Sequence, residues 1–206
     1  MKTNYQILLD SKIREIESSG IRPRLLLHAC CAPCSSYVLE YLSKYFRITL
    51  FFYNPNISQR EEYDVRYEEL CRLVKEMGLD GQVTFVDSEY EPRRFFDIAK
   101  GLEDLPEGSE RCRRCYALRL ETTAKAAASQ GFDLFTTTLS ISPHKNATWL
   151  NEMGKEMADK YGAEYLFSDF KKRGGYLRSC QLSEQYGLYR QDFCGCIYSK
   201  LQREKN

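Results

Sequence analysis

Short apolar runs alternate with longer amphipathic stretches along most of this chain. The apolar runs predict strands at residues 24–28, 48–53, 83–86, 133–137 and 164–167. The amphipathic stretches predict helices at 5–18, 33–45, 59–77, 92–100, 112–130, 147–161 and 171–189. Strands that alternate with helices are typical of a parallel sheet with helices on both faces. We therefore expect an α/β fold in a single catalytic domain, residues 1–206, with residues 1–20 as an N-terminal helical extension.

Proline and glycine mark several of the predicted element ends. Pro33 falls in the first turn of its helix, where a missing N–H costs nothing. Gly131 and Gly162 follow two predicted helices, the usual place for a glycine cap. The pair Gly174–Gly175 weakens the first turn of the helix predicted at 171–189.

Three of the predicted loops reach the same edge of the sheet. Open parallel sheets bind ligands beyond the C-terminal ends of their strands. The loops there are 28–34, 54–58 and 138–146, and they carry cysteines, amides, hydroxyls and the pair His144–Lys145. We expect these groups to converge on one site.

Composition narrows the class of protein. A chain of 206 residues can bury a hydrophobic core without disulfide or metal cross-links. Its 30 Lys+Arg nearly balance its 29 Asp+Glu, so no overall electrostatic field would recruit nucleic acid. The N-terminal stretch lacks the apolar region of a signal peptide, and no run approaches the roughly 20 apolar residues that span a bilayer. We expect a cytoplasmic protein with reduced thiols and no membrane partner.

Seven of the nine cysteines fall into three tight groups. Thiols this close, in a chain without secretory features, are typical of metal ligands or redox groups. Cys71 is predicted to be a small buried hydrophobe, and Cys180 also stands outside the groups. The three groups are Cys30, Cys31 and Cys34; Cys112 and Cys115; and Cys194 and Cys196.

The first group lies between a strand and a helix. Side chains alternate along a strand, so Cys30 and Cys31 should point in different directions if the strand runs through them, and they could then serve two centres. Cys34 follows Pro33 just inside the helix, where the helix dipole favours a thiolate.

The other two groups have different spacings. Cys112 and Cys115 are three residues apart and share a helix face, where the neighbouring Arg111, Arg113 and Arg114 would stabilise thiolates. Cys194 and Cys196 cannot share a helix face at a spacing of two. They need a turning or extended backbone, which the intervening glycine permits.

The number of thiols leaves three kinds of chemistry open. An iron–sulfur cubane takes three or four cysteines, and an open mononuclear site takes three or four ligands, so seven thiolates match one of each. Structural zinc is the second alternative, and thiol–disulfide redox chemistry is the third.

Five segments of the chain match one known family. Together they cover nearly the whole chain from Leu25 to Ser199, and they resemble the cobalamin-independent epoxyqueuosine reductases. The segments are His28-Ala29-Cys30-Cys31-Ala32-Pro33-Cys34-Ser35, Phe52-Tyr53-Asn54-Pro55-Asn56-Ile57, Arg111-Cys112-Arg113-Arg114-Cys115-Tyr116, Thr136-Thr137-Thr138-Leu139 with Ser142-Pro143-His144-Lys145, and Gly187-Leu188-Tyr189-Arg190-Gln191-Asp192-Phe193-Cys194-Gly195-Cys196.

The resemblance implies a HUP-like Rossmann fold and a [4Fe–4S] cluster beside a mononuclear metal ion, iron or zinc, with the seven cysteines as ligands. It implies reductive removal of the epoxide oxygen of epoxyqueuosine, at the wobble position of tRNA, to give queuosine. An external electron donor is then needed. A member of the family can carry Asp at the position of Cys34, which favours Cys34 as a ligand of the lone metal.

Site roles follow as expectations. His144 is the candidate proton donor, since imidazole exchanges protons near neutral pH, although it could instead orient a neighbour or contact phosphate. His28 could brace the first cysteine group. Candidate contacts to the modified base are Tyr53, Asn54 and Asn56, and candidate phosphate contacts are Arg113, Arg114, Lys145, Lys171, Lys172, Arg173 and Arg190.

Two rival functions share parts of this pattern. An ATP-dependent, thiolase-like tRNA enzyme on the same fold would carry a Ser-Gly-Gly phosphate loop after the first strand, where this chain has Cys-Cys-Ala-Pro-Cys. A zinc module that only binds RNA is the other rival, and metal content would distinguish it.

Overall fold

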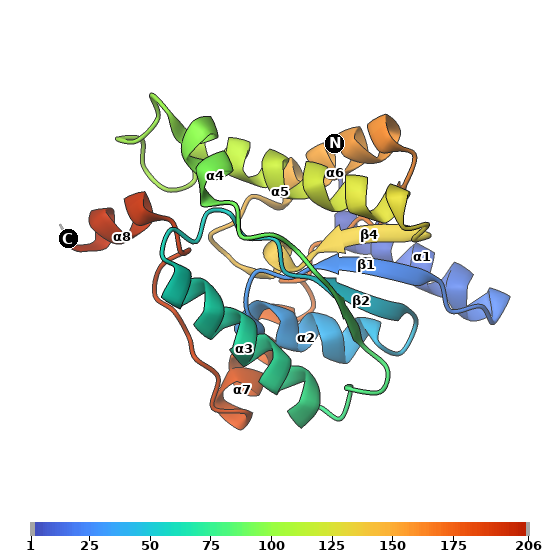
Figure 1. The fold of residues 1–206 in the computed structure, drawn as a ribbon. Helices are drawn as coiled ribbons and strands as arrows, with labels where there is room; N and C mark the ends of the chain where they lie inside the picture. The colour runs from blue at the N-terminus through green and yellow to red at the C-terminus, as the bar shows by residue number, and fades with distance from the viewer. Residues whose placement is uncertain (1–2, 205–206) are drawn as a thin grey trace.

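The computed structural model describes residues 3–204 and confirms the α/β fold (Figure 1). Within these residues one all-parallel sheet has the order β3-β2-β1-β4-β5. His28 at the end of β1 lies opposite Phe51 of β2 and Thr137 of β4. The strands are β1 (Arg24–His28), β2 (Arg47–Phe51), β3 (Thr84–Val86), β4 (Leu134–Thr137) and β5 (Glu164–Tyr165).

Helices cover both faces of the sheet. In Figure 1, α5 and α6 lie above it, whereas α2, α3 and α7 lie below. No helix in the described part of the chain combines the length and apolar character needed to cross a bilayer. The helices are α1 (Tyr5–Ser19), α2 (Ala32–Leu42), α3 (Arg60–Glu76), α4 (Pro92–Ala99), α5 (Glu110–Ser129), the 3₁₀ helix η1 (Thr138–Ile141), α6 (Ala147–Tyr161), α7 (Gly175–Gln185) and α8 (Ile197–Glu204).

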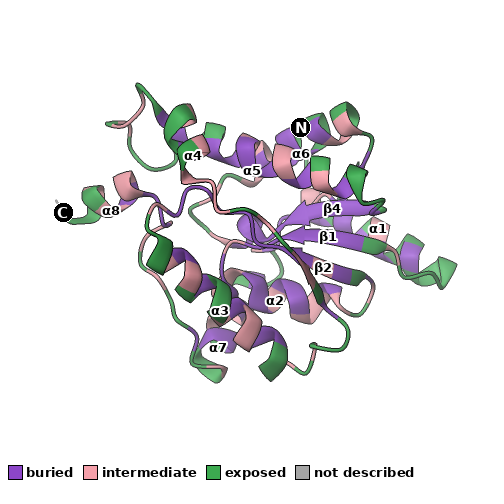
Figure 2. Ribbon diagram, viewed as in Figure 1, coloured by how far each residue is buried: buried purple, intermediate pink, exposed green. Residues whose placement is uncertain are grey.

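The strands supply both hydrophobic cores. Leu25 and Leu27 of β1 pack into the core shared with α1 and α2, while Leu26 packs into the core under α5 and α6. Alternate residues of a strand face opposite sides, so a sheet covered on both faces needs such continuous apolar runs. Figure 2 shows the buried strands between helices whose outer faces are exposed.

Most of the predicted elements are present, and the main difference lies near the C-terminus. The helix predicted at 171–189 is shorter, because Gly174 adopts the left-handed region (φ 75°) and the helix begins only after it. A further helix, α8, follows Cys196 and was not predicted. At the other end of the chain, residues 1–2 of the predicted N-terminal extension lie outside the described residues.

A glycine allows close packing between α6 and β5. A Cβ atom added to Gly154 would lie 2.4 Å from the Tyr165 ring, which is closer than a real contact permits. The small residue therefore lets the helix approach the sheet at this edge.

We expect Gly154→Ala to lower the free energy of unfolding by about 1–3 kcal/mol, because the methyl group overpacks against the Tyr165 ring. Urea denaturation measures the change. Gly81→Ala is the matched control, since its Cβ would meet nothing within 4 Å, and we expect a change within about 0.5 kcal/mol. Equal stabilities of the two variants would contradict the close approach.

Candidate active site

The candidate site lies at the C-terminal edge of the sheet, where the strand order reverses between β1 and β4. Parallel α/β sheets bind ligands at this switch point. The segments after β1 and β4 line a cavity of about 660 Å³, together with Asn54 and part of the C-terminal segment. The predicted convergence of the loops on one edge is confirmed.

Cys30, Cys31 and Cys34 form one compact group at this edge. Their sulfur atoms all lie within 4.8 Å of one another, the tightest cluster of potential metal ligands among residues 3–204. The Cys30 and Cys31 Sγ atoms are 3.7 Å apart. The condition for these two side chains to point apart is not met, because β1 ends at His28 and strand alternation does not extend to them. Cys31 is instead the N-cap of α2, and Cys34 lies in its first turn, as predicted.

The other four cysteines line an adjoining pocket. Cys112 and Cys115 share one face of α5, as predicted, and Cys194 and Cys196 approach from the C-terminal segment. Cys194 also lines the large cavity, so the two cysteine groups border one another. Gly195 separates this last pair with φ 96°, a conformation that other residues rarely adopt.

The loop after β2 holds the C-terminal cysteines in place. The Asn56 side-chain amide donates a hydrogen bond to the Cys194 carbonyl (3.0 Å), and the Ser58 backbone N–H donates to the Gly195 carbonyl (3.1 Å). From α3, the Arg66 guanidinium donates to the Phe193 carbonyl (3.3 Å) and lies 5.2 Å from the centre of the Phe193 ring. The third cysteine group thus owes its position to residues about 130 positions earlier.

Arg119 of α5 is a buried guanidinium that lines both pockets. It donates a hydrogen bond to Asn54 Oδ1, while Asn54 Nδ2 donates to the Ala29 carbonyl (2.9 Å). Sequence reasoning missed this residue. The available signal was its helical spacing, because Cys112, Cys115 and Arg119 are related by i, i+3 and i+7.

His28 is fully buried at the end of β1, two residues before the first cysteine group, as a neutral imidazole. Burial, followed by the charge of Arg119, lowers the pKa of His28 to about 3. His28 Nδ1 lies 2.8 Å from the Thr137 hydroxyl, which also accepts a hydrogen bond from the Leu139 backbone N–H. Nε2 lies 3.0 Å from the Tyr53 carbonyl and 3.3 Å from Arg119 Nε, and the imidazole tautomer decides which of the two it bonds.

One thiol of the first group and one of the third favour the thiolate form. Hydrogen bonds from Cys31 and Cys34 hold the pKa of Cys30 well below its ordinary value, and the Arg119 charge adds to the effect. A hydrogen bond from Cys196, together with the charge of Lys145, lowers the pKa of Cys194 to about 5 against the effect of burial. By contrast, hydrogen bonds with Cys30 and Cys31 raise the pKa of Cys34, against the expected effect of the helix dipole, and burial raises the pKa of Cys112 and Cys115. Thiolates are the form in which cysteine binds metal.

Lys145 lines both pockets and is almost fully buried. Burial disfavours its charge, but the Cys194 thiolate and Glu107 carboxylate outweigh burial and raise the pKa of Lys145. Its Nζ atom donates to Glu107 Oε1 (2.9 Å), and the Ser199 hydroxyl donates to Glu107 Oε2 (2.9 Å). No local signal pointed to Glu107, because these partners lie 38 and 92 positions away.

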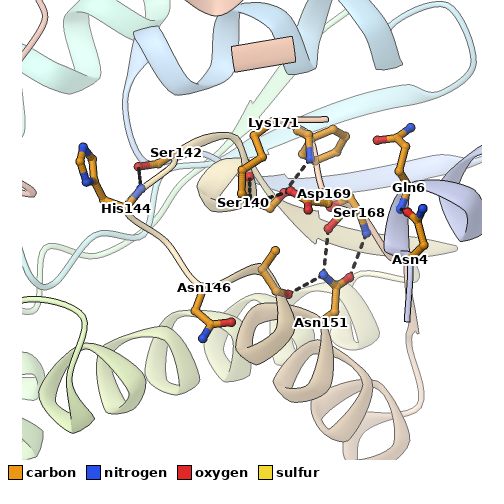
Figure 3. Close-up of polar contacts among 12 residues, drawn as sticks. Asn4, Gln6, Ser140, Ser142, His144, Asn146, Asn151, Ser168, Asp169 and Lys171 are labelled. Carbon is orange, nitrogen blue, oxygen red and sulfur yellow. Dashed lines mark hydrogen bonds and ion pairs between the residues drawn. The ribbon is translucent and has the colours of Figure 1, made fainter. Parts of the chain in front are cut away.

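The remaining predicted residues occupy different places. His144 is exposed at the cavity wall, and Figure 3 shows its ring apart from the contacts that join Ser140, Asp169 and Lys171. The same figure shows Asn151 of α6 next to Ser168, and the two hydrogen bonds between them tie the segment after β5 to this helix. Roles for these residues toward substrate stay predictions.

Two of the predicted base contacts have other partners in the structure. Tyr53 is buried outside the lining of both pockets, and its hydroxyl donates to Glu91 (3.0 Å). Asn54 lines the cavity, with its amide bonded to Ala29 and Arg119. Both residues therefore support the site, and contact with the base is a prediction.

Most of the basic candidates are engaged in ion pairs. Arg113 and Arg114 both lie near Glu110 on the exposed side of α5, so they do not supply the positive charge expected beside Cys112 and Cys115. Lys171 pairs with Asp169, and Arg173 pairs with Asp10. Arg190 differs, because its guanidinium lies at the cavity wall against Cys180 and Tyr176 rather than a carboxylate.

The four-cysteine pocket contains polar atoms that lack partners. Five side chains in the described part of the chain have a buried nitrogen or oxygen without a hydrogen bond, and three of them line this pocket. The three are Asn56, Arg111 and Tyr116. Unpaired buried polar groups are costly and rare. Together with four thiols, they fit a pocket that receives a further group with hydrogen-bonding capacity.

Comparison with known proteins identifies the family. The sequence profile of "Epoxyqueuosine reductase QueH" matches residues 25–202. The chain belongs to this family. A relative from Streptococcus pyogenes is 42% identical over 96% of this chain and 78% of that protein, and one from Staphylococcus epidermidis is 41% identical over 98% and 87%. A third, from Thermotoga maritima, is 38% identical over 88% and 92%. All three are named epoxyqueuosine reductase QueH, so the protein is an oxidoreductase of that family.

A solved structure supports the Rossmann-type fold. The U34-tRNA thiolase NcsA from Methanococcus maripaludis, solved with its [4Fe–4S] cluster, superposes with a TM-score of 0.53. The match covers 94% of this chain and 68% of that one, at 11% sequence identity. Within the QueH family, the close cysteines of this chain support an iron–sulfur cofactor.

We expect Arg119→Met to weaken metal binding by the cysteines about 10- to 100-fold, the usual effect of removing a group that supports metal ligands. The variant removes the buried charge that faces Cys30 and Cys115. Chelator competition measures affinity, with circular dichroism confirming the fold. Arg178→Met, which breaks a surface pair with Glu40, is the control and is expected to bind normally. Affinity unchanged in Arg119→Met would refute the role of this charge.

Proposed function

We propose that this protein removes the epoxide oxygen of epoxyqueuosine at the wobble position of tRNA, giving queuosine, with an iron–sulfur cluster and an adjacent metal ion. Family membership supports the reaction and the substrate. The observation that carries the two-centre arrangement is the division of seven thiols between a compact group and a wider group around adjoining pockets.

The spacing of the thiols supports an assignment of ligands. Sulfur atoms bound about 2.3 Å from one tetrahedral ion lie about 3.8 Å apart. Cys30 and Cys31, 3.7 Å apart, match this spacing, and Cys34 completes a three-thiol site. A cubane binds each cysteine through a different iron and so spreads its ligands further. The four remaining cysteines would hold the [4Fe–4S] cluster.

The reaction takes up two electrons and two protons. The epoxide loses its oxygen as water, and a carbon–carbon double bond forms between the two ring carbons. When bound, the cluster supplies single electrons and the adjacent ion, iron or zinc, supplies a Lewis acid. The protein must therefore bind the modified base, exclude other oxidants and deliver protons.

Residues of the cavity suit these tasks. The cavity of about 660 Å³ opens beside the three-thiol group, so a splayed nucleotide can reach it. The Lys145 ammonium borders both groups and can donate a hydrogen bond to a substrate oxygen. His144 at the wall is the proposed proton donor, and Arg190 is the proposed phosphate contact.

An external electron donor and a cytoplasmic location complete the proposal. Each turnover consumes two electrons that the substrate does not provide, so an external low-potential donor must supply them. The nine cysteines, all within the described residues, are free thiols, and the substrate is tRNA; both fit the cytoplasm.

The ligand assignment makes opposite predictions for two cysteines. Wild-type protein purified anaerobically should contain about four irons and four sulfides plus one further metal per chain. Cys34→Ala is expected to lose the further metal and keep the cluster, whereas Cys112→Ala should lose cluster iron and sulfide. Both should fail to convert epoxyqueuosine in tRNA, as measured by mass spectrometry of the released nucleosides.

Cys71→Ala is the matched control for these variants, because Cys71 lies on α3 outside both pockets and should leave metal content and turnover unchanged. Loss of the cluster from Cys34→Ala would overturn the assignment. Colourless wild-type protein containing zinc alone after reconstitution would overturn the reductase proposal in favour of an RNA-binding zinc module.

Arg190→Gln should weaken tRNA binding. Because one phosphate contact is lost, the slope of the logarithm of the tRNA association constant against the logarithm of salt concentration should become shallower by about one unit. Binding measured at several salt concentrations gives this slope. Lys155→Gln, which removes a cation paired with Asp159 on α6 away from the cavity, should leave the slope unchanged. An unaltered slope in Arg190→Gln would exclude a phosphate contact there.

A further inference from the structure

Tyr116 is a buried phenol whose hydroxyl has no hydrogen-bond partner. On α5 it shares a helix face with Cys112 and Arg119, at spacings of four and three residues, and it directly follows Cys115. All four residues line the four-cysteine pocket. A phenol oxygen buried without a partner costs about 1–3 kcal/mol, so its position calls for an explanation.

The hydroxyl shares its pocket with four thiols. Burial raises the pKa of Tyr116, and the charges that act on it next come from Lys145 and then from Cys112, Cys115 and Cys194. Lys145 already donates to Glu107, so it offers no acceptor to the phenol. The cysteine sulfur atoms that line the same pocket can accept its proton.

We infer that the Tyr116 hydroxyl donates a hydrogen bond to a sulfur atom of the cofactor held by Cys112, Cys115, Cys194 and Cys196, and thereby raises its reduction potential. This inference rests on the proposed function, which puts the cluster in that pocket. Donors to cluster sulfurs stabilise the more electron-rich reduced state. In the proposed reaction the cluster passes electrons to an epoxide, and this hydrogen bond would adjust the driving force of that electron transfer.

The structure offers a matched pair of variants. Tyr165 is also buried with an unpartnered hydroxyl, but it lies at β5 against Phe135 and lines neither pocket. Tyr116→Phe and Tyr165→Phe each remove one buried phenol oxygen and leave the ring. In the metal-free proteins, both should unfold at the wild-type temperature or slightly above it, because an unsatisfied group is lost in each.

The test is a redox titration of the loaded proteins followed by electron paramagnetic resonance, with iron and sulfide counted in each sample. We expect a more negative potential in Tyr116→Phe and the wild-type potential in Tyr165→Phe. Loss of iron and sulfide from Tyr116→Phe also supports the contact, provided that the metal-free variant is as stable as the wild type and that Tyr165→Phe keeps its cluster. Tyr116→Phe differs from the wild type only by the hydroxyl.

Two results would overturn the inference. One is a fully loaded Tyr116→Phe with the wild-type potential, and the other is an equal shift in both variants. Failure of the proposed function is distinguishable from these results, because the wild-type protein itself would then contain no cluster to titrate.

Discussion

The buried positive charge of Arg119 is the constraint around which the site is organised. Taking a guanidinium out of water costs several kcal/mol unless hydrogen bonds and negative charge compensate it. Here Asn54 accepts a hydrogen bond from the guanidinium, and the Cys30 thiol, whose pKa is lowered, supplies negative charge. Asn54 in turn holds the Ala29 carbonyl just before the first group. The positions of α5, the end of β1 and the loop after β2 are therefore coupled, because moving one leaves a buried charge or amide unsatisfied.

The parallel sheet supplies the second constraint. Its strand order reverses between β1 and β4, so the chain leaves the two strands in opposite directions and opens a crevice at their ends. The three-thiol group lies on one side of that crevice, and the loop with His144 and Lys145 lies on the other. The C-terminal cysteines complete the wall only because Asn56, Ser58 and Arg66 hold the backbone around Gly195.

Sequence reasoning succeeded where the interactions are local. The five strands, the shared helix face of Cys112 and Cys115, and the location of Cys34 in the first turn of α2 all follow from periodicity and capping. Strand alternation did not apply to Cys30 and Cys31, because the strand ends at His28 and their sulfur atoms lie together. The pairing of Arg113 and Arg114 with Glu110, away from the thiols, was also missed, since side-chain direction depends on the exposed face of α5.

By itself, the sequence determined the fold class, the family resemblance and the seven candidate ligands, since hydrophobic periodicity and short motifs act within a few residues. Only the tertiary structure decided how the thiols divide between a compact and a wider group. It alone brought Glu107 to Lys145 and Ser199, and left Tyr116 unpartnered among the cysteines. The Glu107 contacts join residues 38 and 92 positions apart, and burial makes each polar partner in these pockets energetically important.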